Sequence, residues 1–419
     1  MHTTPHFVAA PRPVLRETSP PALTFDRAHS SDPHVATSIR ARYDQLMRRL
    51  RYIATDPVQW LPDNEYLPAL TSGALTLAKR VHAELQRSAT AGPDGCASRI
   101  SPTALLASAE SLVARYDHQQ RILVELKNNA RDLCELIAGM PQERPPRYAH
   151  LAKLADHIID QSSGRTAVDD VLPQPGLPVA RIAASELPHE HARVYVEAIQ
   201  AAQLIAWMAV DWFKTREPLR QLVVAGLLRD VGCLSLRCGI MVDPSQFSES
   251  ERQMFHRHPR LSAAMIGRIY QPPVPIARLV ARHHERLDGS GYPARLAGIQ
   301  FNEHLRILTA ADEYITLCRP IAPVMQFVTD PRQRRSAAAA ELSAVAERGQ
   351  LDQEWVARLT GDADHSSTAA LPPSHEIQTS TGTAQHRIDP VQTPHPHQRV
   401  AAPHEPLAPT SSIASPSIS

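Results

Sequence analysis

Apolar residues recur with helical spacing in three segments between residues 36 and 140. The first, ATSIRARYDQLMRRLRYIATD, carries them at intervals of three or four positions, which places them on one face of an α-helix. These residues are Ile39, Tyr43, Leu46, Leu50 and Ile53. The opposite face is basic and either faces solvent or meets an acidic partner. Its arginines are Arg40, Arg42, Arg48, Arg49 and Arg51.

The most regular pattern follows Ser101-Pro102, a pair typical of an N-cap with proline in the first helical turn. Two interleaved sets then recur every seven residues, the spacing of a coiled coil or a long bundle helix. The sets are Leu105, Leu112, Gln119, Leu126, Leu133 and Ala109, Tyr116, Leu123, Ala130, Ile137. Gln119 within this seam would fix the register of two chains. The pattern is equally compatible with a homodimer through the N-terminal helices and with packing inside one chain.

The patterns indicate two helical domains. PQERPPR at 141–147 breaks the periodicity and is the best linker. We therefore expect a helical N-terminal domain over 34–140 and a second helical domain over 148–360. Alternating strand patterns and internal repeats are missing from the sequence, so the expected fold class is all-α.

The two ends differ from the rest of the chain. Residues 1–33 and 361–419 are rich in Pro, Ser, Thr and His and lack apolar periodicity. Such segments bury too little apolar surface to offset the entropy of ordering. We predict that both tails are disordered.

Composition, charge and sequence pattern argue against several functional classes. The formal net charge of +1 gives no global field for nucleic acid or an anionic membrane. The most apolar stretches, such as AAQLIAWMAV, are about ten residues long, against roughly 20 for a membrane span. The N-terminus lacks a signal-peptide pattern. The 5 cysteines form no CxxC pair, so reduced thiols in a cytoplasmic protein are expected.

The candidate chemistry lies between residues 225 and 320. Four segments follow one another there: AGLLRDVGC, FHRHPRLSAAMI, ARHHERLDGSGYP and RILTAADEYITLCRP. Histidines and carboxylates from several helices are the ligands expected for Fe, Mn or a similar ion. Two neighbouring metal ions can supply a hydroxide nucleophile and neutralise charge on a phosphodiester.

The order of these segments resembles the HD-GYP family, a branch of the HD metal-dependent phosphohydrolases. The resemblance is strongest over HHERLDGSGYP, residues 283–293. It implies an all-helical domain that hydrolyses the second messenger cyclic di-GMP at a site of two or three metal ions.

Five metal positions and one phosphate contact follow from the resemblance. Asp230 stands at the bridging aspartate, which is also the catalytic position, and Arg319 at a position that contacts ligand phosphates. The implied metal ligands are Asp230, His258, His283, His284 and Asp312.

Two degenerate positions lie beside them. The histidine before the bridging aspartate is Arg229, and the lysine that contacts substrate phosphate is Cys233. On the upstream helix, the ligand histidine falls within VEAIQAAQLI, where Glu197 or Ala198 stands. His189 and His191 reach the site only if the intervening segment is longer than usual.

Of these departures from the family pattern, Arg229 argues most strongly against a complete metal centre. A guanidinium has no lone pair for a metal ion and stays protonated at physiological pH. It pairs well with carboxylates such as Asp230 or Asp312. The hypothesis is that an internal salt bridge replaces one metal ion, leaving at most a reduced site for Fe or Mn.

The loop DGSGYP is intact. Gly289 and Gly291 permit backbone angles closed to other residues, Asp288 suits turn initiation, and Pro293 stiffens the exit beside Tyr292. The resemblance implies contacts of this loop with partner proteins, including GGDEF-type enzymes that make cyclic di-GMP. The turn is equally well explained by a need in folding.

Three functions remain open. The first is a divergent HD-GYP protein of bacterial cyclic di-GMP signalling with little or no hydrolase activity, acting through protein and nucleotide binding. The second is an active cyclic di-GMP phosphodiesterase with a rearranged metal site, in which Glu197 or His191 replaces the missing ligand. The third is a helical adaptor that binds no nucleotide.

Overall fold

The computed structural model describes most of the chain between residues 33 and 361. The described ranges are 33–60, 66–90, 101–175, 179–183, 186–188, 191–236, 247–269, 271–319 and 333–361, with a few single positions between them. The two tails predicted to be disordered lie almost entirely outside these ranges, as do His189, Cys96 and Cys238.

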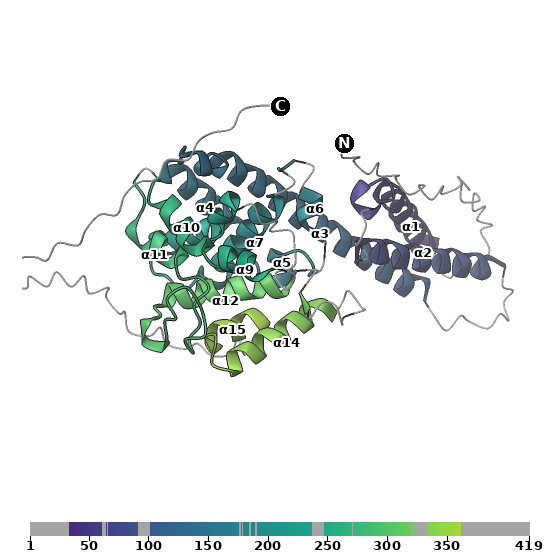
Figure 1. The fold of residues 1–419 in the computed structure, drawn as a ribbon. Helices are drawn as coiled ribbons and strands as arrows, with labels where there is room; N and C mark the ends of the chain where they lie inside the picture. Colours follow the sequence, from purple (N-terminus) through teal and green to yellow (C-terminus); the bar gives the residue numbers. More distant parts are fainter. Residues whose placement is uncertain are drawn as a thin grey trace, which may run out of the picture. The chain divides into compact units, whose positions relative to one another are not determined.

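The described residues form helices and no strand, so the expected all-α fold class is confirmed (Figure 1). The helices of the N-terminal part are α1 (Pro33–Ile53), α2 (Tyr66–Thr90) and α3 (Pro102–Ile137). Those that follow are α4 (Tyr148–Ser162), α5 (Val168–Val171), α6 (Val179–Ala183), α7 (Ala192–Ala209), α8 (Arg216–Leu228), α9 (Glu249–Phe255), α10 (His258–Ile266), α11 (Val274–Val280), α12 (Glu303–Leu317), α14 (Arg334–Glu347) and α15 (Gln353–Thr360). Short 3-10 turns are η1 (Pro57–Trp60), η2 (Met140–Gln142), η3 (Val231–Ser235) and η5 (Gly298–Gln300).

Helix α3 buries its heptad positions within the chain. It packs against α1 and α2, and also against α4, α5, α6 and α7. Leu105, Tyr116, Leu126 and Leu133 are all buried in this packing. The seven-residue pattern therefore marks an intrachain seam in this structure. Self-association through the N-terminal helices stays a prediction.

Part of the basic face of α1 also turns toward α3. The Arg42 side chain donates from Nε to Glu110 at 3.1 Å, and Arg49 donates from Nε to Asp117 at 3.1 Å. Both partners lie one heptad apart on α3, so the two ion pairs hold the helices in register. Such half-exposed pairs typically contribute about 0.2–1 kcal/mol each.

Gln119 is the polar residue inside the seam. Its Oε1 accepts a hydrogen bond at 3.0 Å from the backbone N–H of Gln174, in the segment after α5. This contact satisfies a backbone donor where QPGLP interrupts the helical pattern. Gln119 thus fixes a loop of its own chain against α3.

Helix α7 is the centre of the second helical region (Figure 1). It packs against α3, α4, α6, α8 and α12, and nearly all its side chains are buried. A helix that is buried on nearly every side is stable only inside a core. Arg229 directly follows its neighbour α8, and Asp312 lies on its neighbour α12, so α7 supports both sides of the site described below.

The break at 141–147 separates α3 from α4, as expected. Helix α3 ends at Ile137, η2 follows, and α4 begins at Tyr148. Since α3 packs on helices from both sides of this break, the division into domains at 141–147 stays a prediction. Within the described ranges, none of the helices combines the length and apolarity that crossing a bilayer requires.

Replacing Gln119 by leucine should destabilise the fold by about 1–3 kcal/mol, because the buried N–H of Gln174 loses its acceptor. The measurement is urea unfolding followed by circular dichroism. The matched control is Gln203→Leu on α7. Gln203 is also buried, but its Oε1 has no partner among the described residues, so this change should be neutral or stabilising. Equal destabilisation by both changes would contradict the assigned role of Gln119.

Candidate metal centre

Four side chains gather from separate elements between α8 and α12. Asp230 follows α8, His258 begins α10, and His283 and His284 follow α11. One ligand atom of each lies within 4.8 Å of the others. The structure therefore brings together four of the five residues that the resemblance implied as metal ligands.

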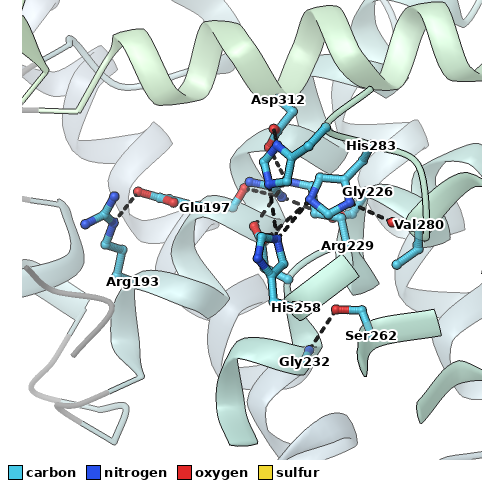
Figure 2. A network of polar contacts seen from close by, with 12 residues as sticks. Arg193, Glu197, Gly226, Arg229, Gly232, His258, Ser262, Val280, His283 and Asp312 are labelled. Atoms are coloured by element: carbon cyan, nitrogen blue, oxygen red, sulfur yellow. Dashed lines mark hydrogen bonds and ion pairs between the residues drawn. The ribbon is translucent and has the colours of Figure 1, made fainter. Parts of the chain in front are cut away.

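Gly232 allows the first two elements to meet. A Cβ at this position would lie 2.6 Å from the carbonyl oxygen of His258 and 2.7 Å from the backbone nitrogen of Ser262. The Gly232 N–H instead donates to the Ser262 hydroxyl at 2.8 Å (Figure 2). This close approach of η3 and α10 places Asp230 beside His258.

Backbone carbonyls orient two of the histidine rings. The Nδ1 of His258 lies 2.7 Å from the carbonyl oxygen of Phe255, and the Nδ1 of His283 lies 2.7 Å from that of Val280. A carbonyl oxygen only accepts hydrogen bonds, so each Nδ1 carries the proton. In the neutral rings, Nε2 therefore holds the lone pair, as metal-binding histidines require.

The acceptor atoms point toward one another. The Nε2 atoms of His258 and His283 are 3.3 Å apart (Figure 2). Oδ1 of Asp230 lies 3.2 Å from the first and 3.5 Å from the second. Acceptors at these distances repel unless a proton or a metal ion lies among them. The donor set of the cluster therefore fits one divalent cation.

The pKa values of Asp230 and His284 favour the unprotonated forms that bind metal, whereas that of His283 favours a proton. Burial would raise the pKa of Asp230, but Arg229 and then His258 and His283 hold that pKa well below its usual range. Burial lowers the pKa of His284 well below its usual value, and the neighbouring His283 and His258 lower it further. Burial opposes protonation of His283 as well, but Asp230 and Asp312 outweigh it and raise that pKa.

Asp312, the fifth implied ligand, is held by Arg229. Its Oδ1 accepts from Arg229 Nε at 2.7 Å, and its Oδ2 faces Nδ1 of His284 at 3.3 Å. Arg229 Nε also lies 3.3 Å from Oδ2 of Asp230. The hypothesis named Asp230 or Asp312 as the partner of the arginine, and the structure shows both.

Arg229 is one of the most buried large side chains. Its exposed fraction is 0%, and its Nη1 donates to the carbonyl oxygens of Glu197 at 3.1 Å and Gly226 at 3.2 Å. Burial would lower the pKa of Arg229, but Asp230 and Asp312 outweigh it and raise that pKa. A permanent cation thus lies between two carboxylates that would otherwise be available to a metal ion.

A second metal ion beside this guanidinium would be strongly repelled. Two unit charges 4 Å apart repel by about 4 kcal/mol at an effective dielectric constant near 20, and a divalent ion doubles this figure. The arrangement accommodates one ion at Asp230, His258, His283 and His284, away from the contact between Arg229 and Asp312.

The upstream candidates for a replacement ligand lie elsewhere. The carboxylate of Glu197 is bound by Arg193, with Nε to Oε1 at 2.7 Å, and by Arg319, with Nη2 to Oε2 at 2.7 Å. His191 is the N-cap residue of α7 and is not part of the four-residue cluster. Arg319, the implied phosphate contact, is engaged by Glu197 here.

Cys233 lies in η3 directly after the bridging aspartate. The side chain is buried and forms no disulfide, and its backbone N–H donates to the carbonyl oxygen of Asp230 at 2.9 Å. A neutral thiol carries no charge with which to bind a phosphate.

The loop that follows the histidine pair is anchored from within. Glu285 is buried, and its carboxylate accepts from the backbone N–H groups of Ala294 at 2.6 Å and Leu296 at 2.8 Å. A Cβ on Gly291 would lie 2.4 Å from the backbone nitrogen of Arg286. Gly291 and Glu285 of HHERLDGSGYP are therefore required to close the turn. The glutamate directly after the histidine pair was the sequence feature that could have indicated the anchoring role of Glu285.

The rest of the loop forms an exposed turn joined to the metal site. Asp288 Oδ1 accepts from the backbone N–H of Ser290 at 2.9 Å, and Gly289 has φ +80. The Tyr292 ring stacks on His284 with centroids 4.8 Å apart, and on His256 at 4.3 Å. Sequence reasoning missed this stack, because nothing in the local pattern pairs His256 with the loop.

Comparisons with known proteins agree with this geometry. Residues 179–354 match the family model described as HD domain. This range contains every residue of the four-residue cluster and the HHERLDGSGYP loop. This part of the chain is an HD domain of the HD-GYP type.

Three curated relatives illustrate the family. The response regulator RpfG of Xanthomonas campestris pv. campestris, a cyclic di-GMP phosphodiesterase, is 32% identical over 104 residues, covering 25% of this chain and 28% of the relative. The cyclic di-GMP phosphodiesterase PA4108 of Pseudomonas aeruginosa is 30% identical over 157 residues, covering 34% of this chain and 38% of the relative. The 3'3'-cGAMP-specific phosphodiesterase 1 of Vibrio cholerae is 28% identical over 144 residues, covering 34% and 33%.

The chain thus aligns with well under half the length of these relatives. Among solved structures, Bd1817, an HDG"Y"P protein from Bdellovibrio bacteriovorus, matches with a TM-score of 0.37 and 14% identity, covering 64% of this chain and 88% of that chain.

Tyr292→Ala should weaken binding of Mn²⁺ by about tenfold, the lower end of what loss of a residue that orients a ligand costs. The reason is that the His284 ring loses the surface against which it stacks. Tyr292→Phe keeps the ring and should bind Mn²⁺ like the wild type. Competition with a chelator of known affinity measures this, and Tyr52→Ala, at an exposed tyrosine of α1, is the control. Equal affinities of the Ala and Phe variants would show that the stack does not position His284.

Proposed function

We propose that this chain is a divergent HD-GYP protein of bacterial cyclic di-GMP signalling with little or no hydrolase activity. The observation that carries the proposal is the buried guanidinium of Arg229, paired with both Asp230 and Asp312. An internal ion pair takes the place of one metal ion, so the two-ion arrangement that would activate water and neutralise a phosphodiester is incomplete. Cys233 in place of lysine removes a further positive charge.

A single divalent ion, Fe or Mn, fits the remaining residues. Asp230, His258, His283 and His284 would hold it, and when bound it would polarise a phosphoryl oxygen. Asp312 keeps Arg229 in place and accepts from His284, which orients that ring. With one ion, the site would serve to bind a nucleotide phosphate rather than to cleave it.

The ligand class follows from the relatives. Their names assign them to cyclic di-GMP or to 3'3'-cGAMP, both cyclic dinucleotides with two phosphodiesters. We take cyclic di-GMP as the ligand in a cytoplasmic protein. GGDEF-type or other signalling proteins would contact the exposed turn around Asp288 and Ser290, and the N-terminal helices would mediate assembly or input.

Each of the two other functions is favoured by one specific observation. The convergence of four donor atoms within 4.8 Å favours an active phosphodiesterase with a reduced metal site. The engagement of Arg319 by Glu197 favours an adaptor that binds no nucleotide. The following experiments separate the three.

Metal analysis of the purified chain should find at most one Fe or Mn ion, with hydrolysis of cyclic di-GMP at background after addition of either metal. Arg229→His should raise the metal content, because it frees two carboxylates and returns an imidazole lone pair. Arg229→Gln should not raise it and should cost about 3–5 kcal/mol of stability, the usual effect of breaking a buried ion pair.

Two outcomes would overturn the inactive assignment. One is two or more tightly bound transition-metal ions per wild-type chain. The other is turnover of cyclic di-GMP by the wild type that Asp230→Ala and His284→Ala both abolish. Either result favours the phosphodiesterase.

Isothermal titration calorimetry should give a saturable heat with cyclic di-GMP, because one bound ion remains to contact its phosphates. Titration with 3'3'-cGAMP distinguishes preference for the purine from recognition of the shared phosphodiester ring. His258→Ala, which removes a cluster residue, should weaken the binding. Absence of heat with both nucleotides in the metal-loaded protein would favour the adaptor.

A further inference from the structure

A second buried cluster of arginines and carboxylate lies beside the metal centre. Glu197 on α7 accepts from Arg193, one turn earlier on the same helix, and from Arg319 after α12. The Arg319 contact is two-pronged, with Nε to Oε1 at 2.9 Å and Nη2 to Oε2 at 2.7 Å. Figure 2 shows Arg193 and Glu197 side by side, next to Arg229.

The donors that hold Glu197 are of a kind that also binds phosphate. Arginine binds carboxylate and phosphate through the same two parallel N–H donors. Burial would raise the pKa of Glu197, but Arg193 and Arg319 outweigh it and lower that pKa. Glu197 is therefore a permanent anion fixed on two guanidinium groups.

The cluster adjoins the proposed ligand site and is not sealed. The backbone carbonyl of Glu197 accepts from Arg229, and Asp312 and Asp230 both contribute to raising the pKa of Arg319. The side chains of Arg319 and Glu197 are 17% and 10% exposed, whereas that of Arg229 is 0% exposed. An anion from solvent can thus approach Arg319 but not Arg229.

The two guanidinium groups share one carboxylate. A phosphate that replaced the carboxylate would find the same N–H donors on Arg319. The carboxylate and a phosphate therefore compete for one set of N–H groups.

We propose that Glu197 is an internal competitor that occupies an anion-binding pair, Arg193 and Arg319, and so lowers the affinity of the site for a phosphate of the ligand. Binding requires the phosphate to displace the Glu197 carboxylate from Arg319. The inference rests on the proposed function, in that the phosphate is taken to belong to a cyclic dinucleotide. It adds Arg193 and Glu197 to the residues that set affinity.

Glu197→Gln tests the competition in the full-length chain, by calorimetry with pyrophosphate and with cyclic di-GMP as separate probes. The variant should bind each probe at least about tenfold more tightly than the wild type, as expected when a charge-assisted competitor is lost. Arg319→Gln added to Glu197→Gln should remove the gain. Glu84→Gln, at a buried glutamate of α2 that pairs with Arg87, is the matched control and should change nothing.

A double variant separates competition from a simple change of charge. Arg193→Gln combined with Glu197→Gln removes one charge of each sign, so the cluster keeps the wild-type net charge while Arg319 is released. Competition expects tighter pyrophosphate binding than in the wild type, whereas a charge effect alone expects equal binding. This variant also removes Arg193 together with the carboxylate it binds, which protects the test if Glu197→Gln alone does not fold.

The outcomes distinguish this inference from the proposed function. If all variants bind cyclic di-GMP as the wild type does, the proposed ligand stands and Glu197 is a static bridge. If the released variants gain pyrophosphate affinity but none binds cyclic di-GMP, the competition stands and the proposed ligand is wrong. Unchanged pyrophosphate affinity in both Glu197→Gln and the double variant overturns the inference.

Discussion

The ion pairs of Arg229 with Asp230 and Asp312 determine what the rest of the site can do. A fully buried guanidinium needs carboxylates close by, since an unpaired buried charge costs several kcal/mol. Both acids belong to the positions at which the family places metal ligands. Arg229 takes Oδ2 of Asp230 and Oδ1 of Asp312, which leaves Oδ1 of Asp230 among the three histidine rings. In the proposed function, this remaining set would hold one ion where the family uses several.

A second arginine–carboxylate group lies on α7. Glu197, which with Ala198 stands in the window where the resemblance places a histidine, binds Arg319 and Arg193. The two arginine–carboxylate groups meet at the backbone of Glu197, whose carbonyl accepts from Arg229. Fixed guanidinium groups thus place positive charge beside the four-residue cluster. The proposal of a site that holds an anion rather than activating water rests on this arrangement.

The presence of the complete HHERLDGSGYP motif has a structural explanation as well as the functional one. Glu285 caps two backbone N–H groups of the loop, Gly291 lies against backbone atoms, and Tyr292 stacks on His284. The first two contacts require the residue type found in HHERLDGSGYP, and the third requires an aromatic ring. Retention of the motif therefore follows from folding of the turn and orientation of one histidine, whether or not a partner binds there.

The sequence by itself determined the helices, the family and the positions of the histidines and acids, because periodicity and motif order are local properties of the chain. The tertiary structure decided which residues meet. Apolar spacing on α3 marks a buried face but not its partner, which is the chain's own α2 and α7. The resemblance implies that Arg229 stands at a ligand position, yet only the packing of α8 against α12 places it between two carboxylates. Glu197 and Arg319 are 122 positions apart, and pairing over such a separation depends on the assembled core.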